Sequence, residues 1–245
     1  MAIVDRRKLS KSMWLIKQML KLDLHLLGSG NDRSEMEEKD MKIVGIYLAA
    51  GSSSRMGSDK LALPVGTMTV GSLGLESALK SPLDEIYVIT KDSDDANWLP
   101  AEMKSDPRCT IIQCSTAHEG QSESLRCGIQ QAQANHADAA LIMLADQPFI
   151  TVQMIKEMIT CMKNNPTCRF VATTFEQSIT PPVLFSSSVY NDLMTLRGDK
   201  GAKAILQGDF LRKGKLLPCT DKRLVFDVDT KDDYQKLQVI EKTKW

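Results

Sequence analysis

Short apolar runs alternate with helix-length segments along most of the chain. Five runs, rich in β-branched and other apolar residues and bounded by polar or turn residues, are predicted strands: "IVGIYLA", "EIYVIT", "CTIIQC", "AALIMLA" and "FVATTF". The segments between them are predicted helices, at about Val70–Lys80, Asp94–Met103, Ser122–Ala134 and Val152–Lys163. Strands that alternate with helices are typical of βαβ units, so the pattern predicts an α/β fold around a mainly parallel sheet.

The pattern becomes less regular after Phe175. The segment "TPPVLFS" and a predicted helix near Val189–Leu196 are followed by a glycine-rich turn, "RGDKGAKAIL". A late predicted strand, "RLVFDVDT", leads into a final helix through Thr230, and Asp233 three residues later fits a capping box. Because no internal repeat or long low-complexity linker interrupts this region, we expect residues 41–245 to form one domain.

The first 40 residues differ in character from the rest. A basic, leucine-rich stretch, "RRKLSKSMWLIKQMLKLDLHLLGSG", precedes an acidic and polar one, "NDRSEMEEKD". A helix over about Ser10–Leu27 is plausible, but its apolar residues cover most sides and form no single stripe. We interpret residues 1–40 as an N-terminal extension that is partly helical or disordered. The alternative is a helix that packs on the domain or on another subunit.

Composition and charge exclude several classes of partner. Lys plus Arg and Asp plus Glu both total 31, so no global basic field favours nucleic acid or an anionic membrane. No stretch reaches the roughly 18 consecutive apolar residues of a spanning helix, and the N-terminus has no signal-peptide cleavage pattern. The six cysteines include no C-x-x-C pair, which favours a reducing compartment over a disulfide scaffold or a structural zinc. We therefore expect a cytoplasmic protein whose ligand binds at a local site.

The segment "YLAAGSSSRMGSDK", Tyr47–Lys60, follows the first predicted strand and crosses the edge of the sheet where ligands of open α/β folds bind. Gly51 and Gly57 let the backbone approach a ligand closely. Arg55 and Lys60 add positive charge, so the loop is suited to a triphosphate. It is not a Walker loop, because no lysine follows Gly57. Taken alone, the segment fits a solvated turn equally well.

A carboxylate follows another predicted strand at the same edge. The strand Ala139–Ala145 ends in Asp146-Gln147-Pro148, where the proline terminates strand pairing. An acidic group beside a triphosphate is well placed to hold Mg²⁺, which prefers carboxylate, phosphate and water oxygens. The alternative is that Asp146 caps the helix that begins near Thr151.

A second acidic pair lies in "VFDVDT". Asp227 and Asp229 would point to one face of a short strand, because alternate residues of a strand share a face. Two carboxylates on one face favour a cation. Asp229 is also placed to help cap the last helix beside Thr230, so Asp227 is the stronger candidate metal ligand.

Five motifs, in the same order along the chain, resemble those of the MobA-like nucleotidyltransferases. They are "LAAGSSSRMGSDK", "GQSESLRCGI", "LADQPFI", "LRGDKGAKAIL" and "FDVDTKDDY", and the resemblance extends from about Val44 to Leu237. It is greatest to the molybdopterin cytidylyltransferase branch and to accessory proteins of xanthine dehydrogenase in purine breakdown. The resemblance implies a three-layer α/β/α fold with a mainly parallel, Rossmann-like nucleotidyltransferase sheet.

The resemblance also implies roles for individual residues. Arg55 and Lys60 would bind the triphosphate and act in catalysis, together with Asp146 as the Mg²⁺ ligand. Asp227 would complete the metal site. The nucleoside would be bound by a larger set of residues, namely Leu48, Ala49, Ala50, Gly51, Gln121, Ser122 and Ser124. Within the family, alanine at the position of Ala50 accompanies cytidine nucleotides and glycine accompanies guanosine nucleotides, which implies CTP rather than GTP.

Two segments depart from the family pattern. The family has G-x-P before "PVLF", where this chain has Ile179–Pro182, and Lys203 replaces the arginine of G-D-x-G-A-R. Both segments resemble acceptor-side features. The nucleotide end of the predicted site is therefore better defined by the sequence than the acceptor end.

These motifs imply Mg²⁺-dependent transfer of a cytidylyl or guanylyl group to molybdopterin cofactor, with release of pyrophosphate. The recipient of the product would be a molybdenum hydroxylase such as xanthine dehydrogenase. One alternative keeps this chemistry with a sugar or polyol phosphate as acceptor. A second alternative is an escort protein that carries molybdenum cofactor without catalysis, although such a protein would not need the cationic loop and the metal carboxylates.

Several conspicuous residues are predicted to have structural roles only. His118 and His136 lie in or beside polar segments that flank helices and are expected on the surface. Cys109, Cys114 and Cys127 are expected to be small packing residues.

Overall fold

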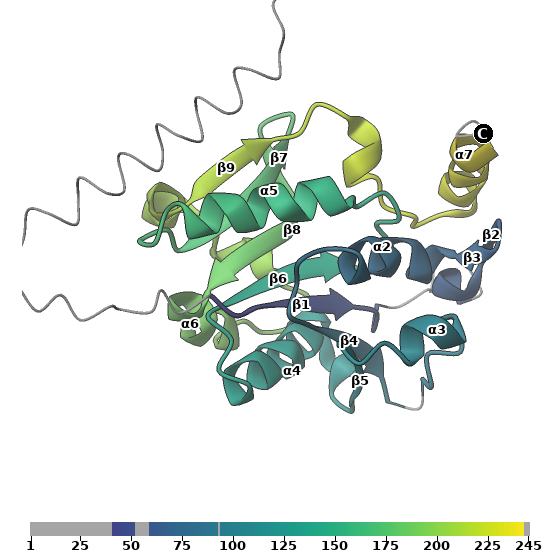
Figure 1. Ribbon diagram of the computed structural model, residues 1–245, viewed down its shortest axis with the longest axis horizontal. Helices are drawn as coiled ribbons and strands as arrows, with labels where there is room; N and C mark the ends of the chain where they lie inside the picture. Colours follow the sequence, from purple (N-terminus) through teal and green to yellow (C-terminus); the bar gives the residue numbers. More distant parts are fainter. Residues whose placement is uncertain (1–40, 52–58, 93, 243–245) are drawn as a thin grey trace, which may run out of the picture. The chain divides into compact units, whose positions relative to one another are not determined.

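A mostly parallel sheet of seven strands forms the centre of the fold (Figure 1). The computed structural model describes residues 41–51, 59–92 and 94–242. Its sheet contains β1 (Ile43–Leu48), β4 (Glu85–Lys91), β5 (Cys109–Cys114), β6 (Ala139–Leu144), β7 (Phe170–Phe175), β8 (Ser178–Ser186) and β9 (Lys215–Pro218), in the order β5-β4-β1-β6-β8-β7-β9. Strands β5, β4, β1 and β6 are parallel, and β8 runs antiparallel to both of its neighbours. The α/β fold with a mainly parallel sheet is therefore confirmed.

Strand β1 lies between two parallel partners and is buried throughout. Its residue Ile46 lies opposite Tyr87 of β4 on one side and Ile142 of β6 on the other. Alternate residues enter different hydrophobic clusters, Tyr47 on one face of the sheet and Ile46 on the other. This alternation explains why the strand is a continuous apolar run in the sequence, since both faces of a parallel sheet are covered.

Helices cover both faces of the sheet. They are α2 (Val70–Leu79), α3 (Ala101–Lys104), α4 (Gln121–Ala134), α5 (Val152–Lys163), α6 (Tyr190–Met194) and α7 (Lys231–Lys242). The apolar faces of α2 and α5 pack in one core cluster, and those of α4 and α6 pack in the cluster on the opposite face (Figure 1). These layers give the three-layer α/β/α arrangement.

Helix α7 packs in a third, smaller cluster. Its Leu237 is fully buried there, together with Val228 and with Val70 of α2. The cluster also contains residues next to a short hairpin formed by β2 (Pro64–Val65) and β3 (Met68–Thr69). The predicted capping box is present at the start of α7, because the Thr230 N–H donates to Asp233 Oδ2 at 3.0 Å and the Asp233 N–H donates to Thr230 Oγ1 at 3.2 Å.

Two predicted elements are wrong. The helix predicted over Asp94–Met103 is reduced to the single turn α3, because the Asp94 carboxylate accepts the N–H of Ala96, whose φ of 50° is incompatible with a helix. Pro100 then immediately precedes the short helix. The strand predicted in "RLVFDVDT" is a 3₁₀ helix, Lys222–Val225, followed by an unpaired segment. The Val228 N–H of this segment donates to the Asp146 carbonyl oxygen at 2.9 Å, so the segment is fixed beside Asp146 without joining the sheet.

Cys114 and Cys127 form a disulfide, which corrects the prediction that they are packing residues. The bond joins the last residue of β5 to helix α4. The paired residues are 13 positions apart with no recognisable spacing motif, so the sequence pattern gave no signal for the pair.

The predicted helix over Ser10–Leu27, and with it the predicted N-terminal extension, lies outside the described residues. In the part of the chain that the structure describes, no helix has the length and apolar character needed to cross a membrane.

Candidate active site

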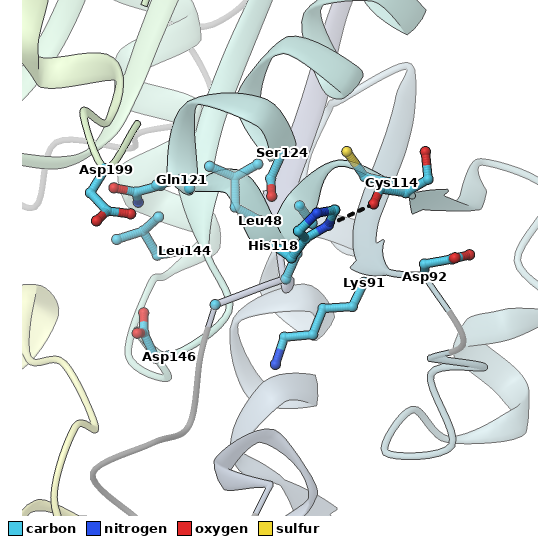
Figure 2. A pocket seen from close by; sticks show the side chains of 15 residues that line it. Leu48, Lys91, Asp92, Cys114, His118, Gln121, Ser124, Leu144, Asp146 and Asp199 are labelled. Carbon is cyan, nitrogen blue, oxygen red and sulfur yellow. Dashed lines mark hydrogen bonds between the residues drawn. The ribbon is translucent and has the colours of Figure 1, made fainter. Parts of the chain in front are cut away.

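A cavity of about 630 Å³ opens at the carboxyl edge of the parallel strands (Figure 2). The last residues of all four of these strands line it: Leu48, Lys91, Cys114 and Leu144. Because parallel strands end at the same edge, residues from four distant parts of the chain meet here. This is the position at which the sequence predicted a ligand.

The loop after β1 enters this cavity. Ala50 and Gly51 line it, while Ala49 is buried behind them and donates its N–H to the Ile89 carbonyl oxygen at 2.8 Å. Gly51 has open space where a side chain would begin. Residues 52–58, which include Arg55, lie outside the described residues, so the predicted role of Arg55 stays a prediction.

The start of helix α4 forms another wall. Gln121 and Ser124 line the cavity, whereas Ser122 is fully buried. The Ser122 N–H donates to the Gly198 carbonyl oxygen at 3.0 Å, which joins this helix to the later glycine-rich segment. Gly120 is required at the junction, because its φ is 130° and a Cβ there would lie 2.5 Å from the Gly198 carbonyl carbon.

Lys60 lies between two carboxylates next to the cavity. Its Nζ is 2.6 Å from Asp146 Oδ2 and 2.9 Å from Asp229 Oδ1. Burial would lower the pKa of Lys60, but the charges and hydrogen bonds of the two carboxylates outweigh it and raise the pKa above its ordinary value. The ammonium group is therefore charged at neutral pH, and it is not directed at open solvent.

Asp227 has a different partner from Asp229. Its Oδ1 accepts a hydrogen bond from Nε2 of the buried Gln147 at 2.8 Å. Desolvation and the nearby carboxylates of Asp146 and Asp229 raise the pKa of Asp227, against the opposing effects of Gln147 and Lys60. Asp227 was predicted, ahead of Asp229, to be the companion of Asp146, yet Asp229 is the residue that shares a cation with Asp146 in the structure.

The alternative role of Asp146 as a helix cap is excluded. Helix α5 is capped by Thr151, whose hydroxyl accepts the Met154 N–H at 3.1 Å. Asp146 lines the cavity instead, on its side nearest the segment that carries Asp227 and Asp229. The carboxylate thus lies at the cavity and not at a helix end.

The residues present fit a divalent metal ion. Oδ1 of Asp146 is buried and has no hydrogen-bond partner among the described residues, so this carboxylate has coordination capacity left over. The described residues contain no group of three or more His, Cys, Asp or Glu arranged as a complete protein cage. Mg²⁺ needs no such cage, since it binds through one or two carboxylates together with substrate phosphates and water.

Five polar residues that line the cavity were not predicted from the sequence: Lys91, Asp92, Ser115, His118 and Asp199. His118 is exposed, as expected, but it lies over the cavity, and its Nδ1 donates to the Ser115 carbonyl oxygen at 2.9 Å (Figure 2). Lys91 could have been found, because it directly follows the predicted strand "EIYVIT" at the ligand edge. Asp199 lies in the motif "LRGDKGAKAIL" but was assigned no role, and nothing in the sequence pattern singled out His118.

A second cavity of about 240 Å³ adjoins the first. Four residues line both: Leu48, Gln121, Leu144 and Asp199. The two segments that depart from the family pattern meet in this second cavity, through Thr180 and Pro181 on one side and Lys203 on the other. Gln147 and Asp227 also line it. The two cavities thus adjoin, with Asp146 lining the first and Asp227 lining the second.

Comparison with known proteins identifies the family. The model of the MobA-like NTP transferase domain matches residues 45–215 of the 245-residue chain. The chain belongs to the MobA-like NTP transferase family. It is 33% identical over 200 residues to the purine catabolism protein PucB of Bacillus subtilis, a match that covers 80% of this chain and 96% of PucB. The resemblance inferred from the five motifs is therefore confirmed.

Solved structures support the same fold. A homologue of Rv0371c from Mycobacterium sp. strain JC1 is 26% identical with a TM-score of 0.67, covering 83% of this chain and 98% of that one. Rv0371c of Mycobacterium tuberculosis in complex with manganese is 23% identical with a TM-score of 0.62, covering 81% and 99%. A 4-diphosphocytidyl-2C-methyl-D-erythritol synthase from Anaerococcus prevotii is 16% identical with a TM-score of 0.63, covering 82% and 96%. The last two matches bear on the fold alone.

Proposed function

We propose that the protein transfers a cytidylyl group from CTP to the terminal phosphate of molybdopterin cofactor and releases pyrophosphate. The observation that carries the proposal is the pair of adjoining cavities at the carboxyl edge, with the cluster of Lys60, Asp146 and Asp229 beside them. The larger cavity is assigned to the nucleotide and the smaller one to the acceptor. Residues 41–245 would form the catalytic domain, and residues 1–40 an extension of it.

The residues of the chain would act mainly by positioning and by electrostatics. The acceptor phosphate attacks the α-phosphorus of CTP, a new P–O bond forms, and the bond to pyrophosphate breaks. Lys60 and Arg55 would stabilise charge on the departing pyrophosphate, and the backbone at Gly51 would hold the phosphates. Asp146, with Asp229 or Asp227, would hold Mg²⁺, which neutralises phosphate charge when bound. No protein base is required, because a phosphate acceptor is already ionised at neutral pH.

The choice of CTP rests on Ala50. This residue lines the nucleotide cavity, and in the family an alanine at its position accompanies cytidine nucleotides. The cytidylyl product named for the Anaerococcus protein is consistent with this nucleotide on this fold. GTP is the alternative nucleotide.

The choice of molybdopterin rests on the relative and on the walls of the smaller cavity. PucB is named as a purine catabolism protein, and purine breakdown uses a molybdenum hydroxylase, xanthine dehydrogenase, as the expected recipient. The smaller cavity has apolar walls from Leu48, Ile142, Leu144 and Val183, which suit a flat heterocycle better than a polyol. Lys203 supplies a cation for the acceptor phosphate. A polyol phosphate, as implied by the name of the Anaerococcus protein, is the second candidate acceptor.

Pyrophosphate release tests the proposal. The protein is incubated with Mg²⁺ and each of CTP, GTP, ATP and UTP, either with molybdopterin cofactor or with a polyol phosphate. We expect release only with CTP and molybdopterin cofactor. Release with the polyol phosphate alone would replace the acceptor, and no release with any combination would refute a catalytic function.

The site assignment is tested by Asp146→Asn in the same assay. The variant keeps the shape of the side chain but removes its charge, so we expect turnover to fall by roughly a hundredfold or more with an unchanged circular dichroism spectrum. Asp192→Asn is the matched control, because Asp192 pairs with Arg169 away from both cavities. Wild-type turnover in Asp146→Asn would remove Asp146 from the metal site.

A further inference from the structure

The ammonium group of Lys60 occupies the place that a metal ion between Asp146 and Asp229 would take. Its Nζ contacts one carboxylate oxygen of each residue, at 2.6 and 2.9 Å, and its side chain is only 8% exposed. A Mg²⁺ ion that bridged the same two oxygens would lie about 2.1 Å from each. That position overlaps the ammonium group, so a metal ion that bridges these two oxygens must displace the ammonium group.

We infer that Lys60 is the resident cation of this carboxylate pair and that a divalent metal ion enters the pair only when a triphosphate draws the ammonium group away. The inference rests on the proposed function and deepens it, because it makes metal binding dependent on nucleotide binding. It assigns Lys60 a second role, in addition to its contact with phosphate.

In the absence of nucleotide, replacement of the Lys60 ammonium group by a metal ion is unfavourable for two reasons. The metal ion must displace two charge-assisted hydrogen bonds, each about twice as strong as a neutral one. It would also separate a buried ammonium group from these two carboxylates, and breaking a buried ion pair is costly. Metal binding to the nucleotide-free protein is therefore weak.

A triphosphate changes this exchange in two ways. Its oxygens offer the Lys60 ammonium group new anionic partners, and the long, flexible lysine side chain can turn toward them. The same triphosphate supplies oxygens to the metal ion, which then needs only the vacated carboxylates to complete its ligands. Because coupling between two ligands is reciprocal, the metal ion also strengthens triphosphate binding by the same factor.

Binding of Mn²⁺ to the full-length protein without nucleotide, followed by electron paramagnetic resonance of the free ion, tests the inference. Lys60→Met removes the competing ammonium group, and with it the positive charge that pairs with the two carboxylates. We expect it to bind Mn²⁺ roughly tenfold more tightly than the wild type, or better, as is typical of coupled sites. Lys42→Met is the matched control: it removes a lysine that pairs with Glu85 at 2.6 Å away from the cavities, and its Mn²⁺ affinity should equal that of the wild type.

Two further variants make the result decisive. Lys60→Gln should gain affinity in the same direction, and it serves if Lys60→Met fails to fold. Lys60→Met combined with Asp146→Asn should lose the gain. Mn²⁺ affinity in the folded Lys60 variant that is no higher than in the wild type, or a gain that survives loss of Asp146, would overturn the inference.

The nucleotide half of the inference is tested with α,β-methylene-CTP, which cannot release pyrophosphate. After correction for Mn²⁺ bound to the free analogue, the analogue should raise Mn²⁺ affinity more in the wild type than in Lys60→Met. An equal increase in the two proteins would contradict the exchange. None of these measurements requires turnover, so absence of cytidylyl transfer would refute the proposed function without deciding the role of Lys60.

Discussion

His118 lines the larger cavity. Its Nδ1 lies 2.9 Å from the Ser115 carbonyl oxygen, which can only accept, so Nδ1 carries the proton. In the neutral ring, Nε2 is then left as an acceptor, and Lys91 adds a donor to the lining of the same cavity. In the proposed function, these groups are suited to the edge of a nucleobase such as cytosine, which has an amino group next to acceptor atoms.

We therefore predict that His118→Ala weakens CTP binding without changing the chemical step. Loss of one hydrogen bond of about 1 kcal/mol should raise KM for CTP roughly fivefold and leave kcat nearly unchanged, since the contact is made equally in the ground state and the transition state. Steady-state kinetics with varied CTP measure this. His136→Asn is the control, because His136 is exposed outside both cavities and asparagine tolerates its φ of 53°. A fall in kcat with KM unchanged would place His118 in catalysis instead.

The glycine that precedes α4 determines how the start of this helix packs against the segment that contains Gly198. Gly120 has a φ of 130°, and its backbone lies against Gly198, so that Gln121 and Asp199 line both cavities. We predict that Gly120→Ala destabilises the fold by roughly 1–3 kcal/mol, the usual cost of a strained backbone at a non-glycine residue. Urea unfolding measures the loss. Glu119→Ala, one position earlier and exposed, should cost far less.

The capping box of α7 makes the stability of this helix depend on pH. Burial alone would raise the pKa of Asp233, but hydrogen bonds from Thr230 and the ion pair with Lys236 outweigh it and hold the pKa below its ordinary value of 3.8. The folded state therefore binds fewer protons than the unfolded state in acid, and the stabilisation is present at neutral pH and lost as pH falls through the folded-state pKa.

We predict that Asp233→Ala lowers the free energy of unfolding by about 1 kcal/mol at pH 7, the usual cost of losing a helix cap. The difference from the wild type should shrink below pH 3.8. Urea unfolding at pH 7 and at pH 3 measures it. A difference that stays constant over this range would show that the charge of Asp233 does not contribute.

Elements with long apolar runs were predicted well, and those governed by local side-chain bonds were not. The strands β1, β4 and β6 follow from burial on both faces, which the sequence records as continuous apolar runs. The helix predicted from Asp94 failed because a carboxylate bound the backbone two residues away. The segment with Asp227 and Asp229 alternates like a strand, but it pairs with no strand in the part of the chain that the structure describes.

The candidate site is a property of the whole fold, and this explains which of its residues the sequence revealed. Asp146 and Lys60 lie 86 positions apart, and Asp229 lies 169 positions from Lys60, yet Lys60 contacts both carboxylates. Motifs identified Asp146 and Lys60 one at a time. Val228, between Asp227 and Asp229, is buried in the small third cluster, and Asp229 is the neighbour that reaches the shared cation, which no local pattern indicates.

At the scale of the whole molecule, the core of the fold begins close to residue 41. Met41 packs against the first core cluster, and the Lys42 N–H donates to Asp138 Oδ2 at 2.9 Å. The Ile43 N–H donates to Asp84 Oδ2 at 2.7 Å, so these backbone contacts fix the start of β1 against β4 and β6. A protein that begins at Met41 keeps all of these contacts.

We therefore predict that deletion of residues 1–40 leaves the midpoint of thermal unfolding within about 2 °C of the wild type, since it removes no core contact described above. Turnover with CTP and the acceptor should also be nearly unchanged. Deletion of residues 1–43 is the matched comparison: it removes Met41 and the two backbone donors as well, and should lower the midpoint by several degrees. Equal loss in the two deletions, or failure of the shorter deletion to fold, would show that the first 40 residues are part of the catalytic domain.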